Sequence, residues 1–141
     1  ISMFDDIPQI VYTSIIIDNQ DPTQKNSKDG LFGRKLLSAN QLTRLVTKHE
    51  FRKHAYVALN LCHIAEPGTP SAFVTVFITD KTDVAEILQD LGTIVEYKIE
   101  LKPRQTFDRS YFILSPTEEM YVISSADNVS ARAEGHDRRI T

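Results

Sequence analysis

The sequence predicts a single α/β (α+β) domain with one sheet, the element order β-α-β-β-α-β-β-β and both helices on one face of the sheet. Three stretches carry this prediction. Residues 72–78 (AFVTVFI) are almost wholly apolar, which is typical of a buried strand. Residues 84–91 place apolar side chains at helical spacing, and residues 93–102 alternate between apolar and charged. A strand, a short helix and a second strand in this order favour a crossover within one sheet.

The helix is expected to lie on the sheet through Val84, Ile87, Leu88 and Leu91, which occupy positions i, i+3, i+4 and i+7. Asp80 is its expected N-cap, with Asp83 in the first turn, and Gly92 is expected to end it in a left-handed cap.

The strand after this helix is expected to have one apolar and one wet face, because its residue types alternate with a period of two. The apolar set is Val95, Tyr97, Ile99 and Leu101, and the charged set is Glu96, Lys98, Glu100 and Lys102.

The first part of the chain is expected to contain one strand and one helix. Residues 1–9 are interpreted as an N-terminal extension, residues 10–17 (IVYTSIII) as a central strand, and residues 18–35 as a mobile polar loop. Ser38 and Gln41 have the spacing of a capping box. They are expected to open a helix with Leu42, Leu45, Val46 and His49 on one face.

The remaining strands are expected to form two hairpins. Residues 56–64 are predicted to pair with the strand at 72–78, and residues 111–114 with 120–123. Residues 126–141 are polar and are expected to form a frayed tail, which leaves residues 10–125 as the domain. Its first six elements match the ferredoxin-like, split βαβ arrangement.

Composition sets bounds on the function. A chain of 141 residues fits one domain. A net charge of −3 does not favour sequence-independent binding to nucleic acid. Cys62 is the only cysteine, so no intrachain disulfide forms. No apolar run is long enough to span a bilayer, and no signal peptide is visible. We therefore expect an intracellular protein of the cytoplasm or nucleus, without a membrane partner.

An acid-x-lysine pattern is the first candidate for chemistry. Restriction-type nucleases use such a pair on a strand, with an upstream acid, to hold a metal ion and activate water. Glu96-x-Lys98 and its repeat Glu100-x-Lys102 match, and Asp80, Asp83 or Asp90 would supply the acid. Solvated charge pairs on an amphipathic strand give the same spacing. Because His49, His54, His63 and His136 lack the spacings of metal sites, we expect no metal and no cofactor.

Binding residues are expected in two places. Residues 25–35 carry four basic side chains that would meet an anion: Lys25, Lys28, Arg34 and Lys35. Residues 71–77 (SAFVTVF) resemble the central strand of RNA-recognition motifs, a family that stacks bases on exposed aromatic side chains. That resemblance implies that Phe73 is a stacking platform, although Ser71 stands at the second aromatic position.

Residues 107–113 (FDRSYFI) and 121–127 (YVISSAD) resemble the end of a phospholipase D-like half-domain. There, His-x-Lys opens a β-hairpin whose second strand ends in Gly-Ser-x-Asn. The resemblance covers residues 72–129. Phe107 stands at the nucleophilic histidine, Arg109 at the lysine, Leu114 at the aspartate, Ser124 at the glycine, Ser125 at the serine and Asp127 at the asparagine. Without the imidazole the family's covalent route has no nucleophile, so the resemblance implies a non-catalytic relative that pairs with itself. An unrelated hairpin is the alternative interpretation.

The sequence therefore predicts a non-enzymatic interaction module that self-associates as a homodimer, as part of a larger protein or assembly. A nucleic-acid-binding domain, either RNA-recognition-like or an inactive phospholipase D-like relative, is the alternative. A divalent-metal nuclease is the second alternative. The expected binding residues are Lys25, Lys28, Arg34, Lys35, Phe73, Glu96 and Lys98.

Overall fold

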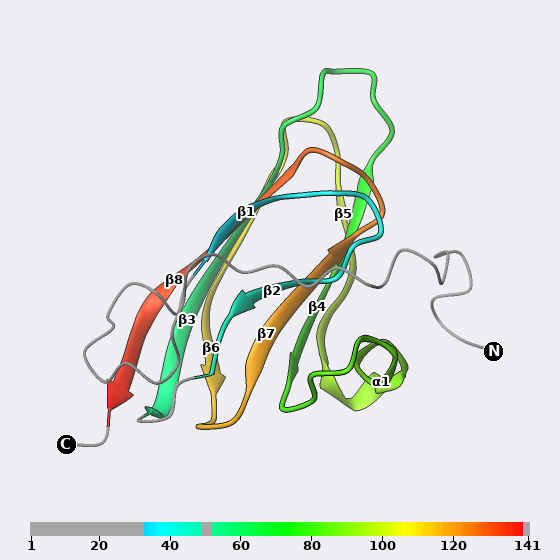
Figure 1. Cartoon of the computed structure of the whole chain (residues 1–141). Helices are drawn as coiled ribbons and strands as arrows, with labels where there is room; N and C mark the ends of the chain where they lie inside the picture. The colour runs from blue at the N-terminus through cyan, green and yellow to red at the C-terminus, as the bar shows by residue number, and fades with distance from the viewer. Residues whose placement is uncertain (1–32, 49–51, 140–141) are drawn as a thin grey trace.

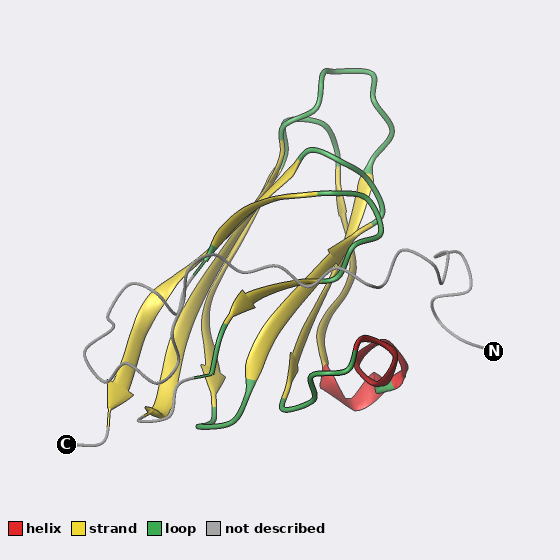
Figure 2. Ribbon diagram, in the orientation of Figure 1, coloured by secondary structure: helices red, strands yellow, loops and turns green. Residues whose placement is uncertain are grey.

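The chain forms a two-layer β-sandwich in the computed structural model, which describes residues 33–48 and 52–139 (Figure 1). Within these ranges eight strands form two four-stranded antiparallel sheets, and a single α-helix lies outside them (Figure 2). The first sheet, called the β3 sheet, has the order β1 (Arg34–Leu37), β8 (Val129–Arg139), β3 (Arg52–His63), β6 (Thr106–Leu114). The second, called the β4 sheet, has the order β2 (Thr43–Val46), β7 (Glu119–Ser124), β4 (Ala72–Thr79), β5 (Ile94–Leu101).

Every connection between consecutive strands passes from one sheet to the other, except the one that joins β4 to β5. Eight strands wound in this way make a double-sheet jelly roll. The loops 38–42, 64–71, 102–105 and 125–128 gather at the upper end in Figure 1. They are tied to one another there: the Ile64 N–H donates to the Asn128 carbonyl at 2.9 Å, and the Arg104 N–H donates to the His63 carbonyl at 2.6 Å.

The main core lies between the two sheets, where alternate side chains of each strand meet. The β3 sheet supplies among others Val57, Leu59, Leu61 and Ala131, and the β4 sheet supplies Val74, Val76, Met120 and Val122. These residues are almost completely buried. Burial of their aliphatic surface is the main force that holds the two layers together.

A smaller apolar cluster lies on the outer face of the β4 sheet, beneath α1 (Val84–Gln89). Its buried members are Leu42, Phe77, Ile87, Leu88, Tyr121 and Ile123. The prediction that this helix lies on a sheet is thus confirmed for Ile87 and Leu88, and Val84 packs against them. It is wrong for Leu91, which is exposed.

The ends of α1 differ from the prediction. Asp83, not Asp80, is the N-cap, and its carboxylate accepts the Glu86 N–H at 3.2 Å. The helix ends before Gly92, because Asp90 takes an extended conformation and Leu91–Thr93 form a 3-10 turn that leads into β5. The Asp90 carboxylate accepts the Gly92 N–H at 3.1 Å, which stabilises this turn without a left-handed glycine.

The predicted fold class is wrong. Instead of one α/β sheet with helices on one face, the described chain has two facing sheets and a single α-helix. The strand-helix-strand unit makes no parallel crossover, because β4 and β5 are antiparallel neighbours. The ferredoxin-like and phospholipase D-like arrangements are therefore both excluded as descriptions of this fold.

Both predicted hairpins are also absent. β3 pairs with β6 and β8, whereas β4 pairs with β5 and β7, so β3 and β4 lie in different sheets. In the same way β6 and β7 belong to different sheets. The hairpin on which the phospholipase D-like resemblance depended does not form.

Two further segments have a different structure from the expected one. The segment expected as a helix from Ser38 contains the strand β2, where Leu45 and Val46 are buried in the main core. A register shift between Arg44 and Val46 lets both of these neighbours reach the core. The expected polar tail contains β8, an inner strand that pairs with both β1 and β3.

The predicted strand at 10–17, the extension 1–9 and most of the predicted loop 18–35 lie outside the described residues. No helix in the described part of the chain has the length and apolar character that crossing a membrane requires.

Candidate functional site

Two of the predicted binding residues, Phe73 and Lys98, line one cavity on the outer face of the β4 sheet. The cavity has a volume of about 320 Å³. Its lining residues are Asn40, Phe73, Thr75, Lys98, Ile123, Ser124 and Ser125. Ile123 also belongs to the apolar cluster beneath α1, so the cavity lies beside the part of the sheet that this helix covers.

A β-bulge in β5 helps to place Lys98. Val74 pairs with Ile99 and Val76 pairs with Glu96, so that Thr75 alone faces two residues, Tyr97 and Lys98. Lys98 has a φ of 45°, and its N–H donates to the Thr75 hydroxyl oxygen at 3.1 Å. The bulge interrupts the alternation of β5 at this point.

Loops from the upper end of the sandwich complete the cavity. The Phe73 N–H donates to the Ser125 hydroxyl oxygen at 2.9 Å, and the Ser125 N–H donates to the Phe73 carbonyl at 2.9 Å. Asn40 has a φ of 60°, and its N–H donates to the Ser124 carbonyl at 2.7 Å. These bonds fix three segments that are far apart in the sequence around one opening.

Glu96 lies elsewhere. It pairs in register with Val76, a core residue, and its carboxylate forms an ion pair with Arg109 of β6. The prediction that Glu96 and Lys98 share a solvent face with Glu100 and Lys102 is therefore wrong, because the bulge separates them. In residues 33–48 and 52–139 no group of three or more His, Cys, Asp and Glu side chains is placed to hold a metal ion.

The basic segment is described only in part. Lys25 and Lys28 lie outside the described residues, and Arg34 and Lys35 belong to β1. Arg34 is exposed and pairs in register with the exposed Arg132, whereas Lys35 pairs with Ala131 of the core. Because neighbours along a strand point to opposite faces, Arg34 and Lys35 do not form one basic patch.

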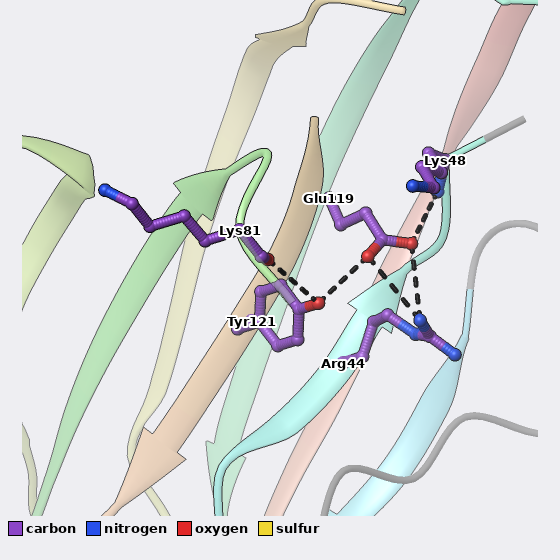
Figure 3. A network of polar contacts seen from close by, with 5 residues as sticks. All are labelled: Arg44, Lys48, Lys81, Glu119 and Tyr121. Atoms are coloured by element: carbon purple, nitrogen blue, oxygen red, sulfur yellow. Dashed lines mark hydrogen bonds and ion pairs between the residues drawn. The ribbon is translucent and has the colours of Figure 1, made fainter. Parts of the chain in front are cut away.

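A buried carboxylate, Glu119, organises a polar network that sequence reasoning missed (Figure 3). It accepts the Lys48 N–H at 2.9 Å and the Tyr121 hydroxyl at 2.9 Å, and the Arg44 guanidinium lies 3.5 Å from both of its oxygens. Glu119 is only 1% exposed. The Tyr121 ring lies in the cluster beneath α1, so the network joins β2, β7 and the helix layer.

The pKa of the Tyr121 phenol is raised above its ordinary value of 10.0, first because the ring is buried and then because the negative charge of Glu119 opposes ionisation. Below pH 10 the phenol is protonated in both the folded and the unfolded chain, so the contribution of Tyr121 to the free energy of unfolding is fully present. As the pH rises further, the unfolded chain loses this proton before the folded chain, and stability is lost.

We therefore expect the stability advantage of the natural chain over Tyr121→Phe to shrink at alkaline pH. At neutral pH the variant loses about 2 kcal/mol, because the hydrogen bond of the phenol to the charged Glu119 carboxylate is removed. Urea unfolding of both proteins from about pH 8 to about pH 11 measures the difference. A difference that grows above pH 10 would contradict the raised pKa.

One side of the sandwich, where the edge strands β5 and β6 lie, exposes large apolar side chains. Among the described residues β5 pairs only with β4, and β6 only with β3. The Arg109–Glu96 ion pair links the two strands. We call this surface the β5–β6 side; the exposed apolar residues of its two strands are Tyr97, Tyr111 and Ile113, with exposed fractions of 47, 77 and 60%. They are three of the seven large hydrophobic side chains that are exposed in the described chain.

Sequence patterns identify Phe73 and Lys98 as candidate binding residues, but they identify neither the loop residues Asn40 and Ser125 nor Glu119. Position 119 precedes a predicted strand, and nothing in its neighbourhood marks it as buried. Comparison of the chain with protein-family models, with curated proteins and with solved structures returned no match.

Proposed function

We propose that the protein is a non-enzymatic interaction module that self-associates through the β5–β6 side. The observation that carries this proposal is the placement of Tyr111. Its side chain is 77% exposed, and its backbone has a φ of 67°, a conformation that is strained for a bulky residue. The folded monomer gains little from holding an aromatic ring there. Strain of this kind is found where a residue has a role outside the packing of its own fold.

The neighbours of Tyr111 support the same surface. Ile113 lies two residues further along β6 and is also largely exposed, and Tyr97 is exposed on β5. An edge strand presents unpaired backbone groups, and apolar side chains beside such an edge favour pairing with another chain. A second copy of the chain offers the same edge, so a two-fold axis would bring two matching surfaces together.

Jelly rolls serve as capsid domains, as lectins and as cupins, so the fold alone does not select a function. Nucleic-acid binding stays the alternative proposal. It draws less support from the geometry, because Arg34 and Lys35 point to opposite faces of β1.

The test is the oligomeric state of the 141-residue chain. We expect sedimentation equilibrium at micromolar concentration to give a dimer, and the double variant Tyr111→Ser, Ile113→Ser to raise the dissociation constant at least about tenfold per side chain.

Leu36→Ser is the matched control. Leu36 is similarly exposed, but it lies on β1 at the opposite edge of the same sheet. A natural chain that stays monomeric, or a control that dissociates as readily as the double variant, would refute the proposed surface.

A further inference from the structure

The cavity on the outer face of the β4 sheet is rich in hydrogen-bond donors. The Thr75 and Ser125 hydroxyl oxygens each accept a backbone N–H, from Lys98 and from Phe73. Each hydroxyl keeps its own hydrogen, and neither donates it to another described residue. By contrast, the Ser124 hydroxyl is occupied, because it donates to the Ala126 carbonyl at 2.8 Å and accepts the Ala126 N–H at 3.1 Å.

Two further donors line the same cavity. The Asn40 side-chain amide carries two N–H groups. The Lys98 ammonium carries three N–H groups and a positive charge, and it lies 5.5 Å from the centroid of the Tyr97 ring. Asn40 is held in place by its backbone bond to Ser124. The lining residues therefore carry four side-chain donor groups from four separate segments, and their side-chain acceptors are the Asn40 carbonyl and the hydroxyl lone pairs. Such a lining suits a ligand that is rich in acceptors and negatively charged.

The apolar part of the lining consists of the aromatic ring of Phe73 and the aliphatic side chain of Ile123. Phe73 is 42% exposed at the cavity, and Ile123 is buried beneath it. The face of an aromatic ring is electron-rich, so it attracts the C–H groups of a saturated ring that lies flat on it. Ligand pockets run from about 300 to 1,000 Å³, and a cavity of about 320 Å³ is therefore suited to a single small ring.

We propose that this cavity binds one monosaccharide unit that carries a carboxylate, a uronic acid. The pyranose C–H face lies on Phe73, the hydroxyl groups of the sugar accept from Thr75, Ser125 and Asn40, and the carboxylate meets Lys98. A uronic acid combines the three features that this lining suits: a saturated ring, several acceptors and a negative charge. The cavity lining includes none of the exposed apolar residues of the β5–β6 side, although the Lys98 ammonium lies 5.5 Å from the centroid of the Tyr97 ring. Sugar binding does not require self-association.

The experiment uses the full chain of 16.0 kDa and follows its backbone amide signals by NMR during titration. The probes are glucuronate, glucose (the same ring without the charge) and cyclohexanecarboxylate (the charge without hydroxyl groups). We expect glucuronate to bind at least about tenfold more tightly than either other probe at low salt. The shifts should be confined to the amides of residues 40, 73–75, 97–99 and 123–125.

Variants locate the site. Lys98→Gln is expected to reduce glucuronate binding to the level of glucose, and Phe73→Ala is expected to weaken both sugars about tenfold. The matched controls are Lys102→Gln and Leu36→Ser, a lysine and an exposed apolar residue outside the cavity, and they should leave the binding of both sugars unchanged. The amide spectrum of each variant shows whether it is folded.

Three results would overturn the proposal. Equal binding of glucose and glucuronate would mean that the charge is not read. Equal binding of cyclohexanecarboxylate would mean that the sugar hydroxyls are not read. Shifts that do not saturate with glucuronate would mean that the cavity holds no such ligand.

Discussion

Gly135→Ala is expected to destabilise the protein by more than about 3 kcal/mol, or to prevent folding. Gly135 lies in β8 opposite Val57 of β3. A Cβ atom at this position would lie 1.8 Å from the Tyr56 carbonyl oxygen and 2.9 Å from its carbonyl carbon. Because these are backbone atoms of the neighbouring strand, no change of rotamer can relieve the clash. The two inner strands of the β3 sheet would have to separate. Chemical denaturation measures the loss.

Two other glycines separate the clash from the general effect of replacing glycine by alanine. Gly92→Ala should change stability by less than about 0.5 kcal/mol, because its added Cβ meets only the Asp90 side chain, at 3.4 Å, in ordinary contact. Gly68→Ala adds backbone strain without a clash, since Gly68 has a φ of 96° and open space around it, and should cost about 1–2 kcal/mol. If Gly135→Ala cost no more than Gly68→Ala, β8 would not approach β3 as described.

Glu119→Ala is expected to lower the free energy of unfolding by about 3 kcal/mol. The substitution leaves the Lys48 N–H and the Tyr121 hydroxyl without the acceptor that both now use, and it leaves Arg44 without its counter-charge. Groups that lose their partner in a buried place bear the full penalty of desolvation. Arg44 is partly exposed and can recover water, which holds the loss at the lower end of the range for buried pairs.

Glu100→Ala is the matched control, on the same sheet. Its carboxylate accepts the Ser71 hydroxyl at 2.8 Å but is exposed, so water can replace the carboxylate and the loss should stay below about 1 kcal/mol. Thermal or urea unfolding at neutral pH compares the two variants. Similar losses in both would show that Glu119 is not the centre of the network.

The sequence predicted individual elements where one local pattern was strong. Residues 72–78 lie in β4, residues 94–101 form a strand, and a short helix covers Ile87 and Leu88 as their spacing indicates. Local patterns do not say which strand pairs with which. An apolar strand next to a helix is compatible with a parallel crossover and with an antiparallel pair that has a helix in its loop, so the fold class was wrong although these elements were right.

Two errors have a clear physical origin. Leu42, Leu45 and Val46 have helical spacing, but the same spacing arises in a strand with a bulge, which turns Leu45 and Val46 to the same side. The segment of β8 is predicted as a tail because residues 126–141 are polar and in places basic. The alternation of Val129, Ala131 and Ala133 with polar residues is nevertheless typical of a half-buried strand, and all three residues are buried in the core.

The candidate site was predictable in part for a similar reason. Phe73 stood out as an aromatic residue of a strand, and Lys98 as a charged one, but their meeting depends on the bulge in β5. Asn40 and Ser125 come to the cavity through loops that are 85 positions apart in the sequence, numbered 40 and 125. The local sequence pattern of either loop carries no information that the other loop lies beside it.

The position of β8 between β1 and β3 has a consequence for how the molecule comes into being. Among the described strands, β8 is synthesised last, and it is the strand that joins β1 to the rest of the β3 sheet. The β3 sheet therefore cannot close before β8 has been synthesised, and until then the earlier strands keep apolar surface exposed. Proteins whose pairings span most of the sequence also acquire their structure slowly, in milliseconds to seconds. The nascent chain is therefore prone to misassembly until β8 has paired with both β1 and β3.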